Sequence, residues 1–153
     1  CYAGHEFGPS FYKDYAITFV LDGCGSYTLE GKTYQISQEM GFVIFPDKQI
    51  SYVADQNTPW EYVFSMFHGA DVPTLLSSVG ISAENPVFQF ENNEDLMDPD
   101  ILDRMCQASK SSNHLGYDVV GFFYRAIALV AHKYAQRYHD MPLSERYVST
   151  ALA

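Results

Sequence analysis

The sequence predicts a mainly β domain, a small antiparallel barrel or sandwich, followed by helices toward the C-terminus. Two observations carry this prediction. Short runs rich in β-branched and aromatic residues recur between residues 15 and 69, separated by glycine, proline or polar turns. After residue 70 the apolar residues recur with helical spacing instead. No helix fits between the β-runs, so the pattern argues against a parallel βαβ arrangement.

The β-runs are expected to alternate with tight turns. They cover residues 15–21, 26–29, 32–36, 42–45, 50–54 and 60–67. Glu30-Gly31 lies between the second and third runs, which is the spacing of a two-residue hairpin. One more extended segment is expected at 85–90, whereas residues 1–14 are expected to be irregular.

Helices are expected in the second half of the chain. Asp71 can cap a short helix that has Pro73 in its first turn and ends at Gly80. Another helix is expected to begin at Asp98, and a further one at Ser144. The longest covers about residues 115–138, with an apolar stripe at helical spacing. Its members are Val119, Phe123, Ile127, Val130 and Tyr134.

Length and charge limit the possible functions. The 153 residues suit one domain, and a formal net charge of −10 disfavours contact of this segment with phosphate backbones. No polybasic run or long apolar segment supports a membrane site. The 3 cysteines lack paired spacing and no signal-peptide pattern is present, so the expected location is the cytoplasm. The chain begins without Met and ends in a helical pattern, which we interpret as part of a longer protein.

Aromatic residues make up 16% of the chain and suit either core packing or a pocket for a polar organic ligand. In a strand over 60–67, Trp60, Tyr62 and Phe64 share one face. On the first β-run, Thr18 and Asp22 share a face. Any single inward aromatic of a small barrel is more often core than ligand contact, so both interpretations stay open.

Several short motifs occur in a characteristic order along the chain. They are Gly4–Pro9, Phe19–Gly25, Gly31–Tyr34, Gly41–Pro46, Ala54-Asp55, Pro59–Tyr62 and Phe67–Gly69. In this order and spacing they resemble the N-terminal effector-binding and dimerisation half of AraC-type transcription regulators. The resemblance covers nearly the whole chain.

The resemblance implies a domain plan and a set of partners. It implies an arm at 1–14, a cupin-like (jelly-roll) barrel at 15–93, a helical dimerisation region at 94–139, and a linker with the truncated start of a DNA-binding domain at 140–153. A small effector, usually a mono- or oligosaccharide, would bind in the barrel. The protein would form a homodimer, contact DNA only through the missing domain, and need no cofactor.

The resemblance also implies roles for individual residues. Phe64 would stack on the effector and Tyr62 would read its polar groups, while the arm would bring His5 to the mouth of the barrel. A member of the family has a basic sugar contact at the position of Asp22, where an acidic group accepts hydrogen bonds instead of donating them. The predicted effector-binding residues are His5, Phe7, Thr18, Asp22, Phe45, Tyr52, Trp60, Tyr62 and Phe64, and the apolar stripe of the long helix is the predicted dimer face.

Catalysis has a specific sequence test in this fold. Metal-dependent cupins carry an HxH pair with a nearby Glu and a later His, and the sequence contains no HxH. It also lacks a Gly-x-Ser-x-Gly elbow and a phosphate-binding glycine loop. We therefore predict a regulatory domain that is not an enzyme and binds no metal. A metal-free cupin enzyme, such as a sugar isomerase or epimerase, is the main alternative, and a carbohydrate-binding module without signalling is a third.

Overall fold

The computed structural model describes residues 3–90 and 117–140. Within these ranges the elements are β1 (Glu6–Phe11), β2 (Tyr15–Asp22), β3 (Cys24–Leu29), β4 (Lys32–Ser37), β5 (Met40–Ile44), β6 (Gln49–Ala54), β7 (Glu61–Phe67), α1 (Val72–Ser78), β8 (Val87–Gln89) and α3 (Tyr117–Asp140). The helices expected to begin at Asp98 and Ser144 lie outside the described residues.

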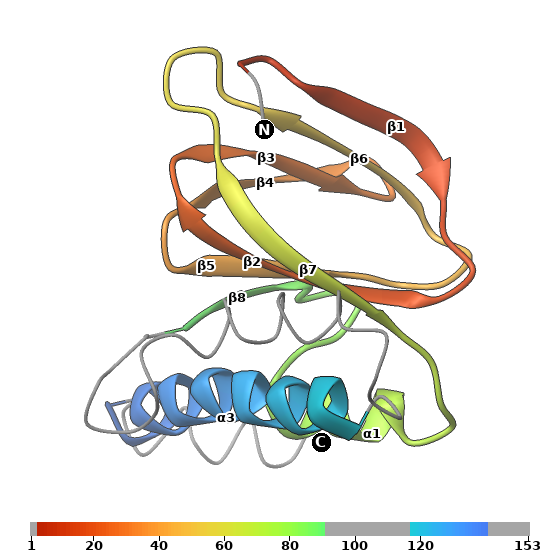
Figure 1. Ribbon diagram of the computed structural model, residues 1–153, viewed down its shortest axis with the longest axis vertical. Helices are drawn as coiled ribbons and strands as arrows, with labels where there is room; N and C mark the ends of the chain where they lie inside the picture. The colour runs from red at the N-terminus through yellow and green to blue at the C-terminus, as the bar shows by residue number, and fades with distance from the viewer. Residues whose placement is uncertain (1–2, 91–116, 141–153) are drawn as a thin grey trace.

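The strands form two four-stranded antiparallel sheets. Sheet A has the order β1-β6-β3-β4, and sheet B has the order β7-β2-β5-β8. Figure 1 shows the two sheets facing each other, with α1 and α3 on the outer side of sheet B. The predicted fold class, a cupin-like antiparallel barrel followed by helices, is confirmed.

The central strand β2 separates two apolar cores. Because side chains alternate along a strand, Ala16 and Val20 point into the space between the sheets, while Ile17 and Phe19 point toward the helices. All four side chains are at most 1% exposed. A strand buried on both faces reads as a continuous apolar run, which is why this β-run was conspicuous in the sequence.

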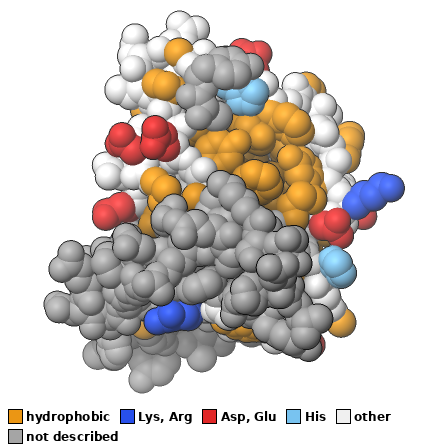
Figure 2. All heavy atoms as spheres, viewed as in Figure 1, with side chains coloured by type: hydrophobic (Ala, Val, Ile, Leu, Met, Phe, Trp, Pro, Cys, Tyr) orange, Lys and Arg blue, Asp and Glu red, His pale blue; other side chains and the backbone are white. Residues whose placement is uncertain are grey.

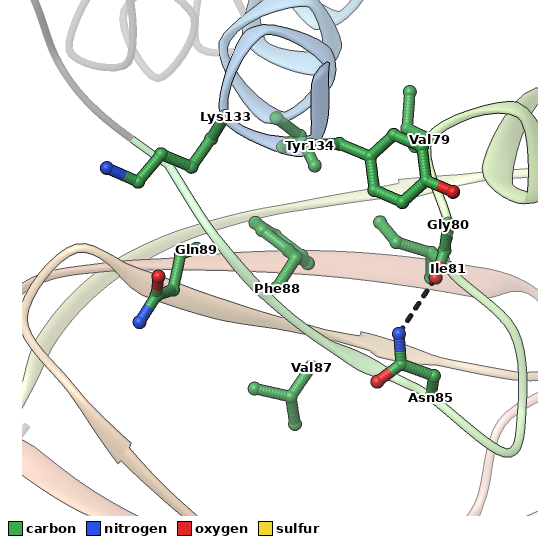
Figure 3. A pocket seen from close by; sticks show the side chains of 10 residues that line it. Val79, Gly80, Ile81, Asn85, Val87, Phe88, Gln89, Lys133 and Tyr134 are labelled. Carbon is green, nitrogen blue, oxygen red and sulfur yellow. Dashed lines mark hydrogen bonds between the residues drawn. The ribbon is translucent and has the colours of Figure 1, made fainter. Parts of the chain in front are cut away.

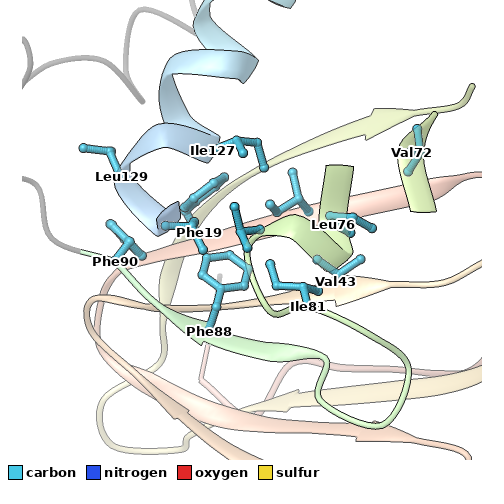
Figure 4. Close-up of a cluster of buried hydrophobic side chains, with 12 residues drawn as sticks. Phe19, Val43, Val72, Leu76, Ile81, Phe88, Phe90, Ile127 and Leu129 are labelled. Atoms are coloured by element: carbon cyan, nitrogen blue, oxygen red, sulfur yellow. The ribbon is translucent and has the colours of Figure 1, made fainter. Parts of the chain in front are cut away.

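The outer core joins sheet B to α1, β8 and α3, as Figure 4 shows. Ile127 and Val130 of α3 belong to it and are only 4% and 2% exposed. Their surface is therefore covered by this chain's own outer core, which leaves almost no exposed area for a second subunit. Tyr134 of the same predicted stripe is 43% exposed. The side chains of the remaining two members, at 119 and 123, lie outside the described ones.

The expectation that residues 1–14 are irregular is wrong. Residues Glu6–Phe11 form β1, which pairs with β6 and places Phe7 opposite Tyr52. The register shifts between Phe7 and Ser10, where Gly8-Pro9 interrupts the alternation that reveals a strand in a sequence. Proline is tolerated there because β1 lies at the edge of sheet A.

The predicted turns and caps agree in part with the structure. Glu30 and Gly31 both have positive φ, 48° and 83°, as the tight turn between β3 and β4 requires. Gly80 follows α1 with φ 76°, and its N–H donates to the carbonyl of Ser77 at 3.0 Å. Asp71 holds the N-cap position, but its side chain makes no capping hydrogen bond.

Candidate functional site

A pocket of about 80 Å³ opens into the space between the two sheets. Its walls come from β2, β5, β6 and β7, from the loop that joins β1 to β2, and from Trp60, which directly precedes β7. The lining residues are Tyr12, Ala16, Thr18, Phe42, Ile44, Tyr52, Trp60, Tyr62 and Phe64. The pocket therefore combines aromatic rings with hydroxyl groups, and none of these described lining residues is charged.

Five of the predicted effector residues line this pocket, namely Thr18, Tyr52, Trp60, Tyr62 and Phe64. The period-two pattern brings Thr18, Tyr62 and Phe64 to one face because β2 and β7 are paired, with Thr18 opposite Phe64. Tyr52 reaches the pocket from β6 of the facing sheet, and Trp60 from the residue before β7. Phe7 lies directly behind them, since its ring stacks on Tyr52 with centroids 5.0 Å apart.

The other predicted residues do not line the pocket. Asp22 lies exposed at the end of β2, beside Glu61 of β7. Phe45 follows β5 and packs edge-on against Tyr15 at 5.8 Å, between the two cores. His5 precedes β1, where its carbonyl accepts a hydrogen bond from Ala54 at 2.9 Å.

Four lining residues were not predicted. Ala16 has the same strand parity as Thr18, and Phe42 and Ile44 alternate along β5, so periodicity could have identified these three. The choice of Phe45 selected the opposite parity on that segment. Tyr12 carries no periodic signal because it lies in the loop between β1 and β2.

The loop between β6 and β7 positions Trp60, because it is hydrogen-bonded to the start of β3. The Cys24 N–H donates to the Thr58 carbonyl at 2.9 Å, and the Asp55 carboxylate accepts from the Thr58 N–H at 2.9 Å. The indole then lies over Gly25, where a Cβ would come within 2.7 Å of Cε3 and Cζ3. Glycine at this place on β3 leaves the room that the indole occupies.

Three tyrosines lie together at one side of the pocket. Burial is the main cause that raises the pKa of Tyr52, and the neighbouring phenols of Tyr62 and Tyr12 add to it through charge and hydrogen bonds. Tyr52 therefore stays neutral, and its hydroxyl group belongs to a small network with these two neighbours. Hydroxyl groups that both donate and accept suit a ligand rich in hydroxyls.

The mouth of the pocket is apolar. Phe64 is 56% exposed and Met66, two residues along β7, is 50% exposed. Figure 2 shows hydrophobic side chains gathered over the barrel part of this face. An exposed aromatic ring at a pocket mouth is available for stacking on a ligand.

Metal-ligand chemistry has no obvious place in the described part of the chain. No group of three or more His, Cys, Asp or Glu residues that could hold a metal ion occurs among residues 3–90 and 117–140. Within the same residues, no helix is long and apolar enough to cross a membrane.

A larger cavity, of about 470 Å³, lies on the opposite side of sheet B (Figure 3). Its walls are the segment between α1 and β8, β8 itself and α3, with Lys133 across from Gln89 and the Tyr134 ring beside Gly80. It contains none of the predicted effector residues. The Asn85 amide on its wall already donates to the Gly80 carbonyl at 2.9 Å. We assign the candidate site to the smaller barrel pocket because predicted residues from separate strands converge there.

Solved structures that are similar to parts of this chain include a cupin protein from Bacteroides fragilis. It is 20% identical, with a TM-score of 0.38 over 44% of this chain and 58% of that chain. KdgF from Halomonas sp. is 19% identical, with a TM-score of 0.39 over 46% of this chain and 66% of that chain. Oxalate decarboxylase from Bacillus subtilis is 14% identical, with a TM-score of 0.38 over 71% of this chain and 25% of that chain.

A curated relative and a family model match the sequence itself. The Msm operon regulatory protein of Streptococcus mutans serotype c is 32% identical over 76 residues, which are 50% of this chain and 27% of that protein. The chain thus matches about a quarter of the relative's length. The family model of the AraC-like ligand binding domain matches residues 1–119. The resemblance noted in the sequence is confirmed, and the chain belongs to the family of AraC-like ligand-binding domains.

Proposed function

We propose that this domain senses a carbohydrate in the barrel pocket and regulates a helix-turn-helix DNA-binding domain outside the given sequence. The protein acts as a homodimer in the cytoplasm, and DNA is contacted only through that second domain. Membership of a ligand-binding family and similarity to an operon regulator support the regulatory part of the proposal. The carbohydrate part is supported by the lining of the pocket.

The observation that carries the proposal is the pairing of aromatic rings with neutral hydroxyl groups. Phe64, Trp60 and Phe42 offer apolar faces, while Tyr52 and Tyr62 offer hydroxyl groups. Sugars present the same combination, because their C–H faces are apolar and their rims carry hydroxyl groups. Pockets of this kind use apolar walls for affinity and a few polar groups for orientation.

The size of the pocket sets how the sugar binds. At about 80 Å³ it is smaller than the ~300–1,000 Å³ of pockets that enclose drug-sized ligands. A monosaccharide therefore inserts one edge among the tyrosines and lies with its face against the exposed ring of Phe64. The remainder of an oligosaccharide extends outward along the apolar mouth.

A path for the signal exists because sheet B is shared by the pocket and the helices. Thr18 lines the pocket, and a Cβ at Gly41 would collide with both the Thr18 carbonyl and the Phe88 ring. Phe88 belongs to the outer core that also contains Ile127 of α3. In this proposal the domain has two states that differ in the position of α3 on sheet B. A sugar that binds one of these states more tightly shifts the equilibrium toward it.

The sugar-binding proposal is tested by thermal shift and calorimetry on the purified chain. A panel of neutral mono- and oligosaccharides should include members that raise Tm, because a ligand bound to the folded state stabilises it. Phe64→Ala and Tyr62→Phe should weaken binding. Tyr15→Phe is the matched control, since Tyr15 stacks on Phe67 with centroids 5.8 Å apart, away from the pocket lining. A panel with no shift would rule the proposal out.

The dimer proposal is tested separately by light scattering over a range of protein concentrations. The predicted face includes Tyr134, whereas Ile127 and Val130 stabilise the helix against its own sheet. A dimer that dissociates in Tyr134→Ala supports the proposal. A chain that stays monomeric at high micromolar concentration contradicts it and leaves the stripe as intramolecular core.

The alternative of a metal-free sugar isomerase finds no supporting observation. Such an enzyme needs a convergent acid and base within hydrogen-bond reach of the substrate. The described lining of the pocket contains no carboxylate, imidazole or amine. Asp22 and Glu61 are neighbours in the strand register, but both are exposed and lie outside the pocket lining.

A further inference from the structure

Trp60 carries a buried hydrogen-bond donor in the wall of the barrel pocket. Its side chain is 1% exposed, and its Nε1 has no hydrogen-bond partner among the described residues. Buried donors without an acceptor are rare in folded proteins because they lose their hydrogen bond to water without replacing it. The N–H of Trp60 therefore needs an acceptor that the described part of the protein does not supply.

The part of the indole that packs on sheet A is not the part that carries the donor. The Cε3–Cζ3 edge lies against Gly25 of β3, and Nε1 is on the opposite edge of the ring. The neighbouring rings belong to Phe42, Tyr52 and Tyr62, at centroid distances of 5.9, 6.1 and 6.3 Å. All three of these rings line the pocket. The ring that carries the donor thus lies among the pocket walls.

The charge of the pocket restricts what can meet this donor. None of its described lining residues is charged, and the whole chain carries a formal net charge of −10. An anionic ligand would be repelled by the chain and would lose its hydration without gaining a cationic partner. A cationic group would lose its hydration without an anionic partner in the described lining, and an ammonium only donates, so it cannot accept the indole proton itself.

We propose that the effector is an uncharged saccharide and that Trp60 Nε1 selects it by donating a hydrogen bond to one of its oxygens. The tyrosine and threonine hydroxyls of the pocket adapt to donors or acceptors, whereas the indole only donates. Trp60 therefore requires an acceptor at one defined position of the sugar. Uronic acids, sugar phosphates and amino sugars are excluded. This inference rests on the proposed function, since it concerns the same pocket.

The single tryptophan permits a direct test, because the chain has one indole N–H signal in a ¹⁵N–¹H NMR spectrum. The purified chain is titrated with D-glucose, D-galactose, L-arabinose, sucrose and melibiose, and in parallel with D-galacturonate, D-glucose 6-phosphate and D-glucosamine. A neutral sugar that raises Tm should also move the indole proton downfield and slow its exchange with solvent. The charged sugars should leave both Tm and the indole signal unchanged.

Each outcome separates this inference from the proposed function. A neutral sugar that raises Tm without moving the indole signal overturns the role of Trp60 and leaves carbohydrate sensing intact. If a charged sugar raises Tm as much as its neutral counterpart does, the proposed selection against charged sugars is wrong. If no sugar binds, the proposed function fails and this inference fails with it.

A double-mutant-type cycle, which combines the Trp60→Phe variant with deoxy analogues of the sugar, locates the hydrogen bond. Trp60→Phe keeps an aromatic ring but removes the N–H, so it should weaken binding of the active sugar by about tenfold. One monodeoxy analogue of that sugar should bind the unaltered protein about tenfold more weakly and lose nothing further in Trp60→Phe. Equal losses for every analogue would assign Trp60 to packing alone. If the variant does not fold, the NMR titration of the unaltered chain still decides.

Discussion

The ring of Tyr134 in α3 lies directly over Gly80, which follows α1. A Cβ at Gly80 would come within 2.8 Å of Cδ2 and 3.1 Å of Cζ of that ring, and Gly80 has a φ of 76°. The long helix α3 therefore packs through Tyr134 against Gly80. Only glycine fits at this position, because the ring leaves no room for a Cβ and because the backbone has a positive φ. This contact ties α3 to the segment that leads into β8.

Gly80→Ala should lower the free energy of unfolding by about 1–3 kcal/mol, because the new methyl group meets the ring and the left-handed backbone is strained. Tyr134→Ala added to it should recover part of this loss, since the ring is then absent. The measurement is a double-mutant cycle by urea denaturation. Strictly additive effects would show that the two residues do not contact each other in solution.

Gly25→Ala tests the position of Trp60. The added methyl group would come within 2.7 Å of the indole, so we expect a loss of about 1–3 kcal/mol in unfolding free energy and a shifted fluorescence maximum. Trp60 is the single tryptophan of the chain, so fluorescence reports on it alone. Gly121→Ala is the matched control, because a Cβ there meets nothing within 4 Å and the helix should gain stability instead.

Ile127→Ala tests whether α3 belongs to the core of one chain. Ile127 is 4% exposed against sheet B, so truncation should lower the unfolding free energy by about 2–5 kcal/mol at every protein concentration. Arg125→Ala, at an exposed position two residues away, should change it by less than about 0.5 kcal/mol. A loss that appears only at low protein concentration would instead place Ile127 in a subunit interface.

The buried tyrosines predict a loss of stability in alkali. Burial, with a smaller effect of neighbouring Tyr34, raises the pKa of Tyr27 above its usual value, and its hydroxyl donates to the Val43 carbonyl at 3.0 Å. Above pH ~10 the unfolded chain releases this proton while the folded chain keeps it, so stability falls as pH rises. The contribution of Tyr27 is fully present below pH ~10 and declines above it by about 1.4 kcal/mol per pH unit.

Urea denaturation between about pH 8 and pH 11 measures this decline. Tyr27→Phe should reduce the slope above pH ~10, and at neutral pH it should cost about 1 kcal/mol through the lost hydrogen bond to Val43. An unchanged alkaline slope in the variant would mean that Tyr27 does not ionise in this way.

Local patterns were sufficient for most of the fold. The β-runs that became β2 to β7, the turn at Glu30-Gly31 and the helix that became α1 were all predicted from period-two alternation, turn residues and a terminal glycine. These signals are local because strand pleat and helix pitch repeat over a few residues. The strand β1 was missed because Gly8-Pro9 breaks its alternation, and its existence depends on pairing with β6.

The sequence by itself determined the family, the barrel architecture and the strand faces that carry Thr18, Tyr62 and Phe64, with Trp60 directly before the second of these strands. Only the tertiary structure decided that Tyr12 joins them, because Tyr12 lies in the loop between β1 and β2 and carries no periodic signal. Burial was likewise decided by the fold. An apolar stripe on a helix has the same pattern whether it covers a sheet or a second subunit, and Ile127 and Val130 cover the sheet.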